Sequence, residues 1–313
     1  MKIVYLDAKT MGDDIDLSVF EQFGEFVKYD TSTTEEVAER VVDADIILTN
    51  KVKINEATIK DAKDLKLVCV TATGTDNLDK DYLDARGIGW RNVAGYSTNT
   101  VAQTTFTLLL YILTKSRYYD DYVKSGAYTT SDVFTNLDEK FFELAGKTWG
   151  IIALGAIGRK VAEIAKAFGC EVIYYDKSTF EQGEQLGYKQ VDLDTLLATS
   201  DVVSIHAPLT DETLNLIDKD ALAKMKPSAF LINVARGPII NEQDLADALN
   251  NGIIAGAGLD VLTIEPMSVD NPLGQIKDSR KLFITPHIAW GSVESRTSLI
   301  NLVVNNIKNF FAN

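Results

Sequence analysis

The sequence predicts an α/β protein with two domains, each a doubly wound parallel sheet, and one of the two is discontinuous. Short apolar segments typical of buried strands alternate with amphipathic helical segments along almost the whole chain of 313 residues. This length exceeds the size at which one hydrophobic core usually serves a chain. The alternation is interrupted once, by a long helical segment near the middle, and we place a boundary between the domains there.

The first part of the chain contains four predicted strands with helices between them. Thr33 and Glu36 have the spacing of a capping box, which predicts a helix that extends to Val41. We place the strands at residues 2–6 (KIVYL), 45–49 (DIILT), 65–72 (LKLVCVTA) and 87–93 (GIGWRNV), and further helices at residues 55–62 and 79–86.

The middle of the chain departs from this alternation. Residues 97–119 contain no glycine or proline and have an apolar face that includes Val101, Phe106, Leu109 and Leu113, so we predict one long helix. Residues 118–143 are polar and aromatic with weak periodicity. We expect this segment to form an arm or a contact between subunits.

The second part of the chain contains six predicted strands. The last predicted helix, residues 294–311, is amphipathic, and we expect it to pack on the first domain, which makes that domain discontinuous. The strands are placed at residues 148–154, 171–176, 201–207, 229–235, 253–260 and 282–286, and the helices between them at residues 158–168, 192–198, 218–225 and 241–250.

Composition excludes several classes of partner. The formal net charge of −14 and the pI of about 4.6, with no compensating basic run, argue against nucleic acid and anionic membranes. The longest apolar run is too short to cross a bilayer, and the N-terminus has no signal-peptide pattern. The two cysteines, Cys69 and Cys170, are predicted to be buried free thiols, as expected in a reducing cytoplasm. We predict no metal site.

Residues 148–176 have the layout of a Rossmann-like dinucleotide site. A buried strand leads into Gly155, Ala156, Ile157 and Gly158, where a helix begins whose N-terminus can bind a pyrophosphate. Ala153 stands where the usual G-x-G-x-x-G pattern has its first glycine, and an alanine is tolerated there if its φ angle is negative. Asp176 ends the next strand, 18 residues after Gly158 (176 − 158), where an acidic side chain binds the adenine ribose and favours NAD over NADP.

Three residues of the second part carry the chemistry needed to reduce a 2-oxo acid. Arg236, in NVARGPII, is a cation that can bind the substrate carboxylate. His287, in ITPHIAW, can give a proton to the ketone oxygen while a hydride reaches the carbon. Glu265, in DVLTIEP, can fix the imidazole in one tautomer and favour its protonated form. His206 is a weaker candidate, and we expect it to be a structural or cofactor-lining residue.

These segments resemble the D-isomer-specific 2-hydroxyacid dehydrogenase family over essentially the whole chain. The resemblance rests on TATGTDNLD, VAQTTFTLLL, GKTWGIIALGAIG, VVSIHAPLT, LINVARGPIINEQDLADAL, GAGLDV and ITPHIAW, in that order. It implies that Arg236 binds the substrate carboxylate, that Glu265 is the partner of the histidine, and that His287 exchanges the proton. It further implies that Asp260 lies near the nicotinamide and that the backbone of Thr73 and Gly74 receives the substrate carboxylate.

The remaining site predictions concern residues that line the cofactor or the substrate. Lys51 and Trp290 are predicted to contact the substrate, although a surface role for Lys51 and a packing role for Trp290 remain open. The full set of predicted cofactor contacts is Gly155, Ala156, Ile157, Gly158, Asp176, His206, Pro208, Thr213, Val234, Ala235 and Asp260.

The resemblance also suggests a branch of the family and an organisation of the chain. The segments TNK, TATGTDN, GYST and HIAW are similar to the D-glycerate dehydrogenase (hydroxypyruvate reductase) branch. We expect a substrate domain of residues 1–98 and 286–313, a dinucleotide-binding domain of residues 99–285, and a homodimer. The open alternatives are a reductase of D-lactate type or for another 2-oxo acid, and a binding protein that senses NAD.

Overall fold

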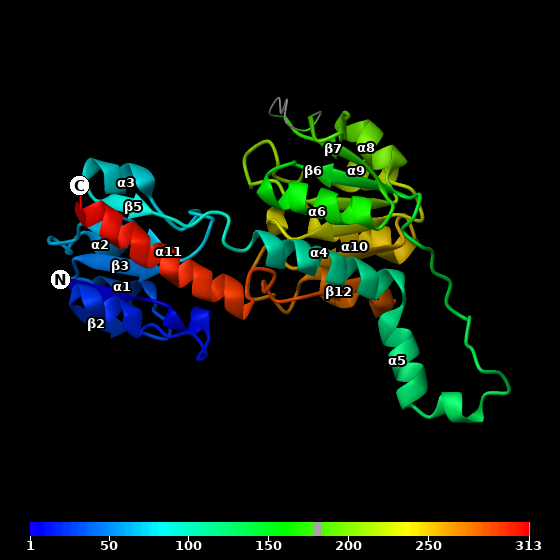
Figure 1. The fold of residues 1–313 in the computed structure, drawn as a ribbon, viewed down its shortest axis with the longest axis horizontal. Coiled ribbons are helices and arrows are strands. Elements are labelled where there is room, and N and C mark those ends of the chain that lie inside the picture. Colours follow the sequence, from blue (N-terminus) through cyan, green and yellow to red (C-terminus); the bar gives the residue numbers. More distant parts are fainter. Residues whose placement is uncertain (178–182, 184, 313) are drawn as a thin grey trace. The chain divides into compact units, whose positions relative to one another are not determined.

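The chain divides into two compact units, which we describe one at a time. The computed structural model describes residues 1–177, 183 and 185–312. The first unit consists of Met1–Ser97 and Gly291–Asn313, and the second consists of Thr98–Trp290 (Figure 1). Residues 286–290 therefore pack with the second unit. Among the described residues, no helix combines the length and the apolar character that crossing a membrane requires.

The first unit is built on a five-stranded parallel sheet. Its strand order is β2-β1-β3-β4-β5, which is the doubly wound order of flavodoxin-like folds. The apolar segments predicted as strands are buried in its centre, where β3 and β4 are buried at every position. The strands are β1 (Lys2–Tyr5), β2 (Glu25–Lys28), β3 (Ile46–Thr49), β4 (Leu67–Val70) and β5 (Gly89–Arg91).

Helices cover both faces of this sheet. Side chains of the first three helices pack with one face, and the C-terminal helix, red in Figure 1, contacts β4 on the other. The first helix begins with the capping box predicted from Thr33 and Glu36. The helices are α1 (Thr34–Arg40), α2 (Glu56–Ile59), α3 (Lys80–Ala85) and α11 (Val293–Ala312), with short 3-10 turns η1 (Ala8–Met11) and η2 (Ser18–Phe23).

The second unit is built on a seven-stranded parallel sheet of order β12-β11-β10-β9-β6-β7-β8. The order reverses between β9 and β6, as in doubly wound dinucleotide-binding folds. The strands are β6 (Thr148–Ile152), β7 (Glu171–Tyr175), β8 (Lys189–Gln190), β9 (Val202–Ile205), β10 (Phe230–Asn233), β11 (Gly256–Leu259) and β12 (Leu282–Ile284).

Two helical layers enclose the second sheet, each around its own apolar cluster. One layer contains α4 and α6, which contact each other. The opposite layer contains α8, α9 and α10. The helices are α4 (Thr98–Leu113), α5 (Ser116–Lys124), α6 (Ala156–Ala167), α8 (Leu193–Thr199), α9 (Lys219–Lys224) and α10 (Glu242–Asn251), with 3-10 turns η3 (Ala127–Thr130), η4 (Gly237–Ile239), η5 (Pro272–Gln275) and η6 (Ser279–Lys281).

The structure corrects the prediction of one unbroken helix over residues 97–119. α4 ends at Leu113, and Lys115 adopts a left-handed backbone with φ of 55° before α5 begins. The hydroxyl of Thr114 bonds back to the carbonyl of Leu110 and also contacts Ser116. Apolar positions that pack on the sheet end at Leu113, and α5 buries no residue, so nothing holds it in line with α4.

Candidate active site

Three neighbouring strands of the second unit end at the same edge of the sheet, and each is followed by a predicted catalytic residue. β10 pairs with β11 and β11 pairs with β12, all in parallel. Arg236 follows β10, Glu265 follows β11, and His287 follows β12. A Cβ atom at Gly237 would lie 2.0 Å from the carbonyl carbon of Leu262. The Arg236 turn therefore packs directly on the backbone of the loop that carries Glu265.

His287 and Glu265 are joined by a short hydrogen bond. Nδ1 of His287 lies 2.7 Å from Oε2 of Glu265. An ionised carboxylate can only accept, so Nδ1 carries the proton and Nε2 is the ring nitrogen left to exchange a proton with a ligand. The other oxygen of Glu265 accepts the amide of Leu262 at 2.9 Å, which fixes the direction of the carboxylate.

The turn that presents His287 is anchored by Asp260, a role that the sequence interpretation missed. Oδ1 of Asp260 accepts the hydroxyl of Thr285 at 2.6 Å and the amide of Ile288 at 2.9 Å, and Oδ2 accepts the amide of Ala289 at 2.8 Å. Asp260 is 1% exposed, and this burial raises the pKa of its carboxyl. The anchor holds His287 in a left-handed backbone conformation, with φ of 55°.

Arg236 stands in a second anchored turn. The side chain of Asn233 accepts the amide of Ala235 at 3.0 Å and donates to the carbonyl of Arg236 at 2.8 Å. The guanidinium donates to the carbonyl of Ala235 at 2.8 Å. An asparagine at the end of a strand, two residues before a buried alanine, is the sequence signal that could have identified this turn.

The strand–turn–helix unit at β6 and α6 has the shape of a phosphate-binding turn. The N-terminus of α6 lies at Ala156, directly after Gly155. A Cβ at Gly155 would meet no atom within 4 Å, so the backbone there is open to a ligand. A Cβ at Gly158 would lie 2.3 Å from the carbonyl oxygen of Ala153, so that glycine allows close packing of helix against turn. The residues fit a pyrophosphate bound at a helix N-terminus.

Ala153 does not meet the condition of a negative φ angle under which an alanine is tolerated without strain. Its φ is +71°, in the left-handed region that favours glycine. The amide of Ala153 donates to the carbonyl of Tyr175 at 2.8 Å, which ties the turn to the end of β7. The turn therefore keeps the geometry that the usual glycine provides, and the alanine side chain makes it more strained.

Asp176 follows β7 and borders the same turn. Its Oδ2 accepts the amide of Leu154 at 3.0 Å, so the carboxylate is oriented beside the glycine turn. The neighbouring Lys177 forms an ion pair of 2.9 Å with Glu212. The positive charge of Lys177 is thus paired with the carboxylate of Glu212, in the loop after β9.

His206 lies at the end of β9, in the row of strand ends at the same edge. The indole of Trp149 donates to the hydroxyl of Ser204 at 2.8 Å, and that hydroxyl lies 3.0 Å from Nε2 of His206. Burial lowers the pKa of His206 to about 3, so the ring is neutral. Its Nδ1 is buried and forms no hydrogen bond with the part of the chain that the structure describes, which leaves one unpaired polar atom at this edge. Two further predicted cofactor contacts lie in the loop that follows: the hydroxyl of Thr213 donates a hydrogen bond to the carbonyl of Pro208 at 2.7 Å.

The other predicted substrate residues are divided between the two units. Lys51 follows β3, and Thr73 and Gly74 follow β4, in the first unit. The hydroxyl of Thr73 donates to the carbonyl of Val93 at 2.9 Å. Trp290 belongs to the second unit, and its indole donates to the carbonyl of His287 at 3.0 Å.

Comparison with known proteins decides the family. Residues 106–289 match the model of the D-isomer specific 2-hydroxyacid dehydrogenase, NAD binding domain. The chain belongs to this family. As a D-2-hydroxyacid dehydrogenase it is an oxidoreductase that uses a nicotinamide dinucleotide, which agrees with the glycine turn and with the acid–imidazole pair described above.

Several known proteins are similar to this D-2-hydroxyacid dehydrogenase over 99% or more of its chain. A hydroxypyruvate reductase of Blautia hydrogenotrophica is 39% identical over 99% of this chain and 97% of its own. A glycerate dehydrogenase of Methylorubrum extorquens is 38% identical over 99% of this chain and 96% of its own. An NADPH-dependent glyoxylate/hydroxypyruvate reductase of Sinorhizobium meliloti, solved with NADP and malonate, has a TM-score of 0.84 and 28% identity and covers 100% of this chain and 94% of its own.

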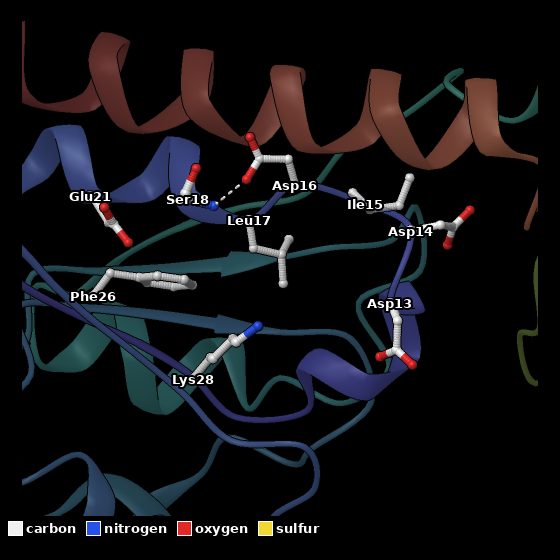
Figure 2. Close-up of a pocket in the computed structure, with 9 residues that line it drawn as sticks. All are labelled: Asp13, Asp14, Ile15, Asp16, Leu17, Ser18, Glu21, Phe26 and Lys28. Carbon is white, nitrogen blue, oxygen red and sulfur yellow. Dashed lines mark hydrogen bonds between the residues drawn. The ribbon is translucent and has the colours of Figure 1, made fainter.

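The first unit of the dehydrogenase contains a pocket of about 540 Å³ in which acidic lining residues outnumber basic ones (Figure 2). Its lining includes four acidic residues, Asp13, Asp14, Asp16 and Glu21, and one cation, Lys28. Asp14 is paired with Arg296 of α11. An anionic 2-oxo acid or a dinucleotide phosphate would be repelled by this lining, so the pocket is not a candidate for either ligand.

Proposed function

We propose that this dehydrogenase reduces hydroxypyruvate to D-glycerate with NADH and reduces glyoxylate more slowly. The observation that carries the proposal is the His287–Glu265 pair of 2.7 Å at the edge where Arg236 also follows its strand. One proton donor and one cation are the groups that reduction of a 2-oxo acid requires from the protein. The relatives named hydroxypyruvate reductase and glycerate dehydrogenase support the substrate class.

In this proposal each catalytic residue has one task. Arg236 binds the substrate carboxylate and orients the ketone. A bound dinucleotide supplies the hydride, and Nε2 of His287 gives a proton to the ketone oxygen. Glu265 accepts a hydrogen bond from Nδ1–H of His287 throughout, which keeps Nε2 directed at the substrate and stabilises the charged ring that donates the proton. Asp260 acts through the His287 turn as a positioning residue.

The cofactor contacts follow the turn and the strand ends. The amides around Gly155 and Ala156 bind the pyrophosphate, and Ile157 and Gly158 hold the helix against the strand. The other contacts that we assign to the dinucleotide are His206, Pro208, Thr213, Val234, Ala235 and Asp260. The orphan Nδ1 of His206 supports its place in this group.

We assign NAD rather than NADP to this site. The Asp176 carboxylate is held beside the turn by the amide of Leu154 and would repel a 2′-phosphate. Lys177, the cation that could offset this repulsion, is paired with Glu212. The solved relative from Sinorhizobium meliloti is NADPH-dependent, so the choice varies among similar proteins and needs a direct test.

The first unit, in this proposal, is the substrate domain and the second is the dinucleotide-binding domain. The backbone of Thr73 and Gly74 contacts the substrate carboxylate, and Lys51 contacts the hydroxyl on the third carbon. Trp290 borders the reacting end of the substrate next to His287. Discrimination between hydroxypyruvate and pyruvate depends on the third carbon, because both share the carboxylate and the adjacent carbonyl, whereas glyoxylate has no third carbon.

A kinetic panel tests the proposal. The measurement is kcat/KM for hydroxypyruvate, glyoxylate, pyruvate and longer 2-oxo acids with NADH and with NADPH, and chiral analysis of the product. We expect hydroxypyruvate with NADH to rank first and D-glycerate to form. A preference for pyruvate or for a bulky acid, or formation of L-glycerate, contradicts the assignment of substrate. Binding of NADH without turnover of any 2-oxo acid would favour a sensor.

The oligomeric state and the cellular location of the enzyme are part of the same proposal. We infer a homodimer, because the arm of residues 118–143 exposes apolar side chains that water does not favour, among them Phe134 and Leu137. We infer a cytoplasmic location, because Cys69 and Cys170 are both free and buried.

A further inference from the structure

A buried carboxylate lies where the strand order of the first sheet reverses. β1 neighbours β2 on one side and β3 on the other, and the chain continues from β3 to β4 and β5, so the switch point lies between β1 and β3. In such sheets, ligands bind outside the carboxyl ends of the strands at the switch point. Asp7 follows β1 at this place and is 5% exposed.

The Asp7 carboxylate holds the turn that follows β3. Oδ1 accepts the amide of Asn50 at 2.9 Å, and Oδ2 accepts the amides of Lys51 at 2.7 Å and Val52 at 3.3 Å. The hydroxyl of Thr49 adds a contact of 3.5 Å. All of these partners are donors, and three consecutive amides converge on one anion, so this turn of residues 49–52 requires an ionised carboxylate.

The same turn is tied to the loop that carries Thr73 and Gly74. The amide nitrogen of the Asn77 side chain donates to the carbonyl of Val52 at 2.9 Å, and the backbone amide of Ile54 donates to the carbonyl of Asn77 at 2.9 Å. Both loops that we assign to the substrate in the first unit are therefore held, directly or through Asn77, by Asp7.

Burying the Asp7 carboxylate costs desolvation free energy that an apolar side chain would not cost. Burial raises the pKa of Asp7, and the amides of residues 50–52 only partly offset that effect. Within the turn, the amide of Lys51 is fixed by Asp7 while its side chain is exposed. Stability alone does not explain why a charged residue is buried here. The Asp7 carboxylate fixes the backbone of Lys51, an exposed lysine at a ligand-binding edge, so we attribute its presence to the positioning of Lys51.

We infer that Asp7 is a positioning residue that determines substrate specificity, because it holds the turn of residues 49–52 so that Lys51 meets the hydroxyl on the third carbon of the substrate. This inference rests on the proposed function. Hydroxypyruvate carries that hydroxyl and pyruvate does not. The preference for hydroxypyruvate over pyruvate therefore depends on the Asp7 carboxylate.

The test is the substitution Asp7→Asn in the full-length protein. An asparagine keeps the size of the side chain but directs an NH2 group at backbone amides, so the turn loses its position. We expect the ratio of kcat/KM for hydroxypyruvate to that for pyruvate to fall roughly 5- to 150-fold, the range of one unpaired polar group. The loss should appear mainly in KM for hydroxypyruvate, and KM for NADH should stay the same.

Asp45→Asn is the matched control. Asp45 precedes β3 at the opposite edge of the sheet and accepts the amide of Lys2 at 2.8 Å and the amine of Lys66 at 2.6 Å. It should lower the melting temperature without changing the substrate ratio. An equal loss on both substrates in Asp7→Asn, or an unchanged ratio, overturns the inference. A wild-type enzyme that does not reduce hydroxypyruvate refutes the proposed function instead.

Lys51→Met provides a second route if Asp7→Asn does not accumulate as folded protein. It removes the amine, keeps the length of the side chain and leaves the Asp7 contacts in place. We expect the same fall in the substrate ratio. If Asp7→Asn folds, adding it to Lys51→Met should change the ratio no further, because both act on one contact. A wild-type ratio in Lys51→Met overturns the inference.

Discussion

His287 combines a fixed tautomer with a strained backbone. A left-handed conformation costs a non-glycine residue about 1–2 kcal/mol, so something must hold His287 at φ of 55°. The bonds from Asp260 to both sides of the residue provide that hold. Strain of this kind is common at sites where a side chain has to point in one direction.

The first prediction concerns His287. His287→Ala should lower kcat for ketone reduction by roughly 10²–10⁴-fold, because no other described imidazole lies at these three strand ends to give the proton. The dissociation constant for NADH, measured by fluorescence, should hardly change. Glu265→Gln keeps the shape of the hydrogen bond and removes its charge, so it should lower kcat less. Wild-type turnover in His287→Ala would show that another group donates the proton.

The second prediction concerns Asp176. Asp176→Ser should raise the NADPH-to-NADH ratio of kcat/KM by roughly fivefold or more, because a like charge removed at contact distance is worth at least about 1 kcal/mol. Asp218→Ser, at the N-cap of α9 in the same unit, serves as the control and should leave the ratio unchanged. Equal efficiency of the wild type with both cofactors would falsify the assignment.

The third prediction concerns Ala153. Ala153→Gly relieves a left-handed alanine, worth about 1–2 kcal/mol, and adds freedom to the unfolded chain, worth about 0.4–1 kcal/mol. We expect a net gain in the free energy of unfolding of up to about 1.6 kcal/mol, and a higher melting temperature without cofactor. Ala167→Gly, in the last turn of α6 where the backbone is helical, should lower it. A lower melting temperature in both variants would mean that the turn is not strained.

At the scale of elements, buried strands are the part that the sequence predicts well. Segments such as IILT and LVCV form strands because every side chain is buried and all but that of Thr49 are apolar. β2 was missed because it lies at a sheet edge and none of its four residues is buried, and β8 was missed because it has two exposed residues. The end of α4 could not be predicted, since it depends on where the sheet stops and not on a helix-breaking residue.

The fourth prediction concerns His206, at the end of β9, and the loss of folding stability at acid pH. Burial lowers the pKa of His206 to about 3, whereas an unfolded histidine titrates near 6.5. Between these values the unfolded chain binds more protons, so stability from this residue is complete above pH ~6.5 and is lost as the pH falls towards ~3.

His206→Asn removes this titration. The melting temperature of the wild type should therefore fall more steeply than that of His206→Asn when the pH is lowered from 7 to 4. Parallel curves over that range would show that His206 is accessible to protons in the folded protein.

At the scale of the molecule, charge and topology act together. The protein carries a net charge of −14 and its proposed substrate is an anion, so binding depends on local cations such as Arg236 and not on the overall field. Both sheets are parallel and doubly wound, which brings loops far apart in the sequence to one edge. The chemical roles of Arg236, Glu265 and His287 could be predicted from residue type and resemblance. The anchor Asn233 follows a pattern readable in the sequence, because its bonds reach only residues 235 and 236. The anchor Asp260 could not be predicted, because its role depends on the loop of residues 285–289 that the folded sheet brings into contact with it.

The last prediction concerns the arm. α5 leads away from the body of the second unit before the chain returns to β6 (Figure 1). Phe134 is 89% exposed and Leu137 is 75% exposed there, together with Val133 and Phe141. A cluster of apolar side chains this exposed is expected to be covered by another protein surface, and a second copy of the chain is the partner that we propose.

Replacing Phe134 and Leu137 by glutamate should therefore separate the subunits. We expect the wild type to sediment with about twice the chain mass of 34.5 kDa and the double variant with the mass of one chain at micromolar concentration. Val42→Glu is the matched control, because Val42 is 48% exposed in the first unit and should leave the mass unchanged. A wild type that sediments as a single chain, or a double variant that remains a dimer, would remove the arm from the proposed interface. A monomeric variant that still reduces hydroxypyruvate would show that each chain holds a complete set of catalytic residues.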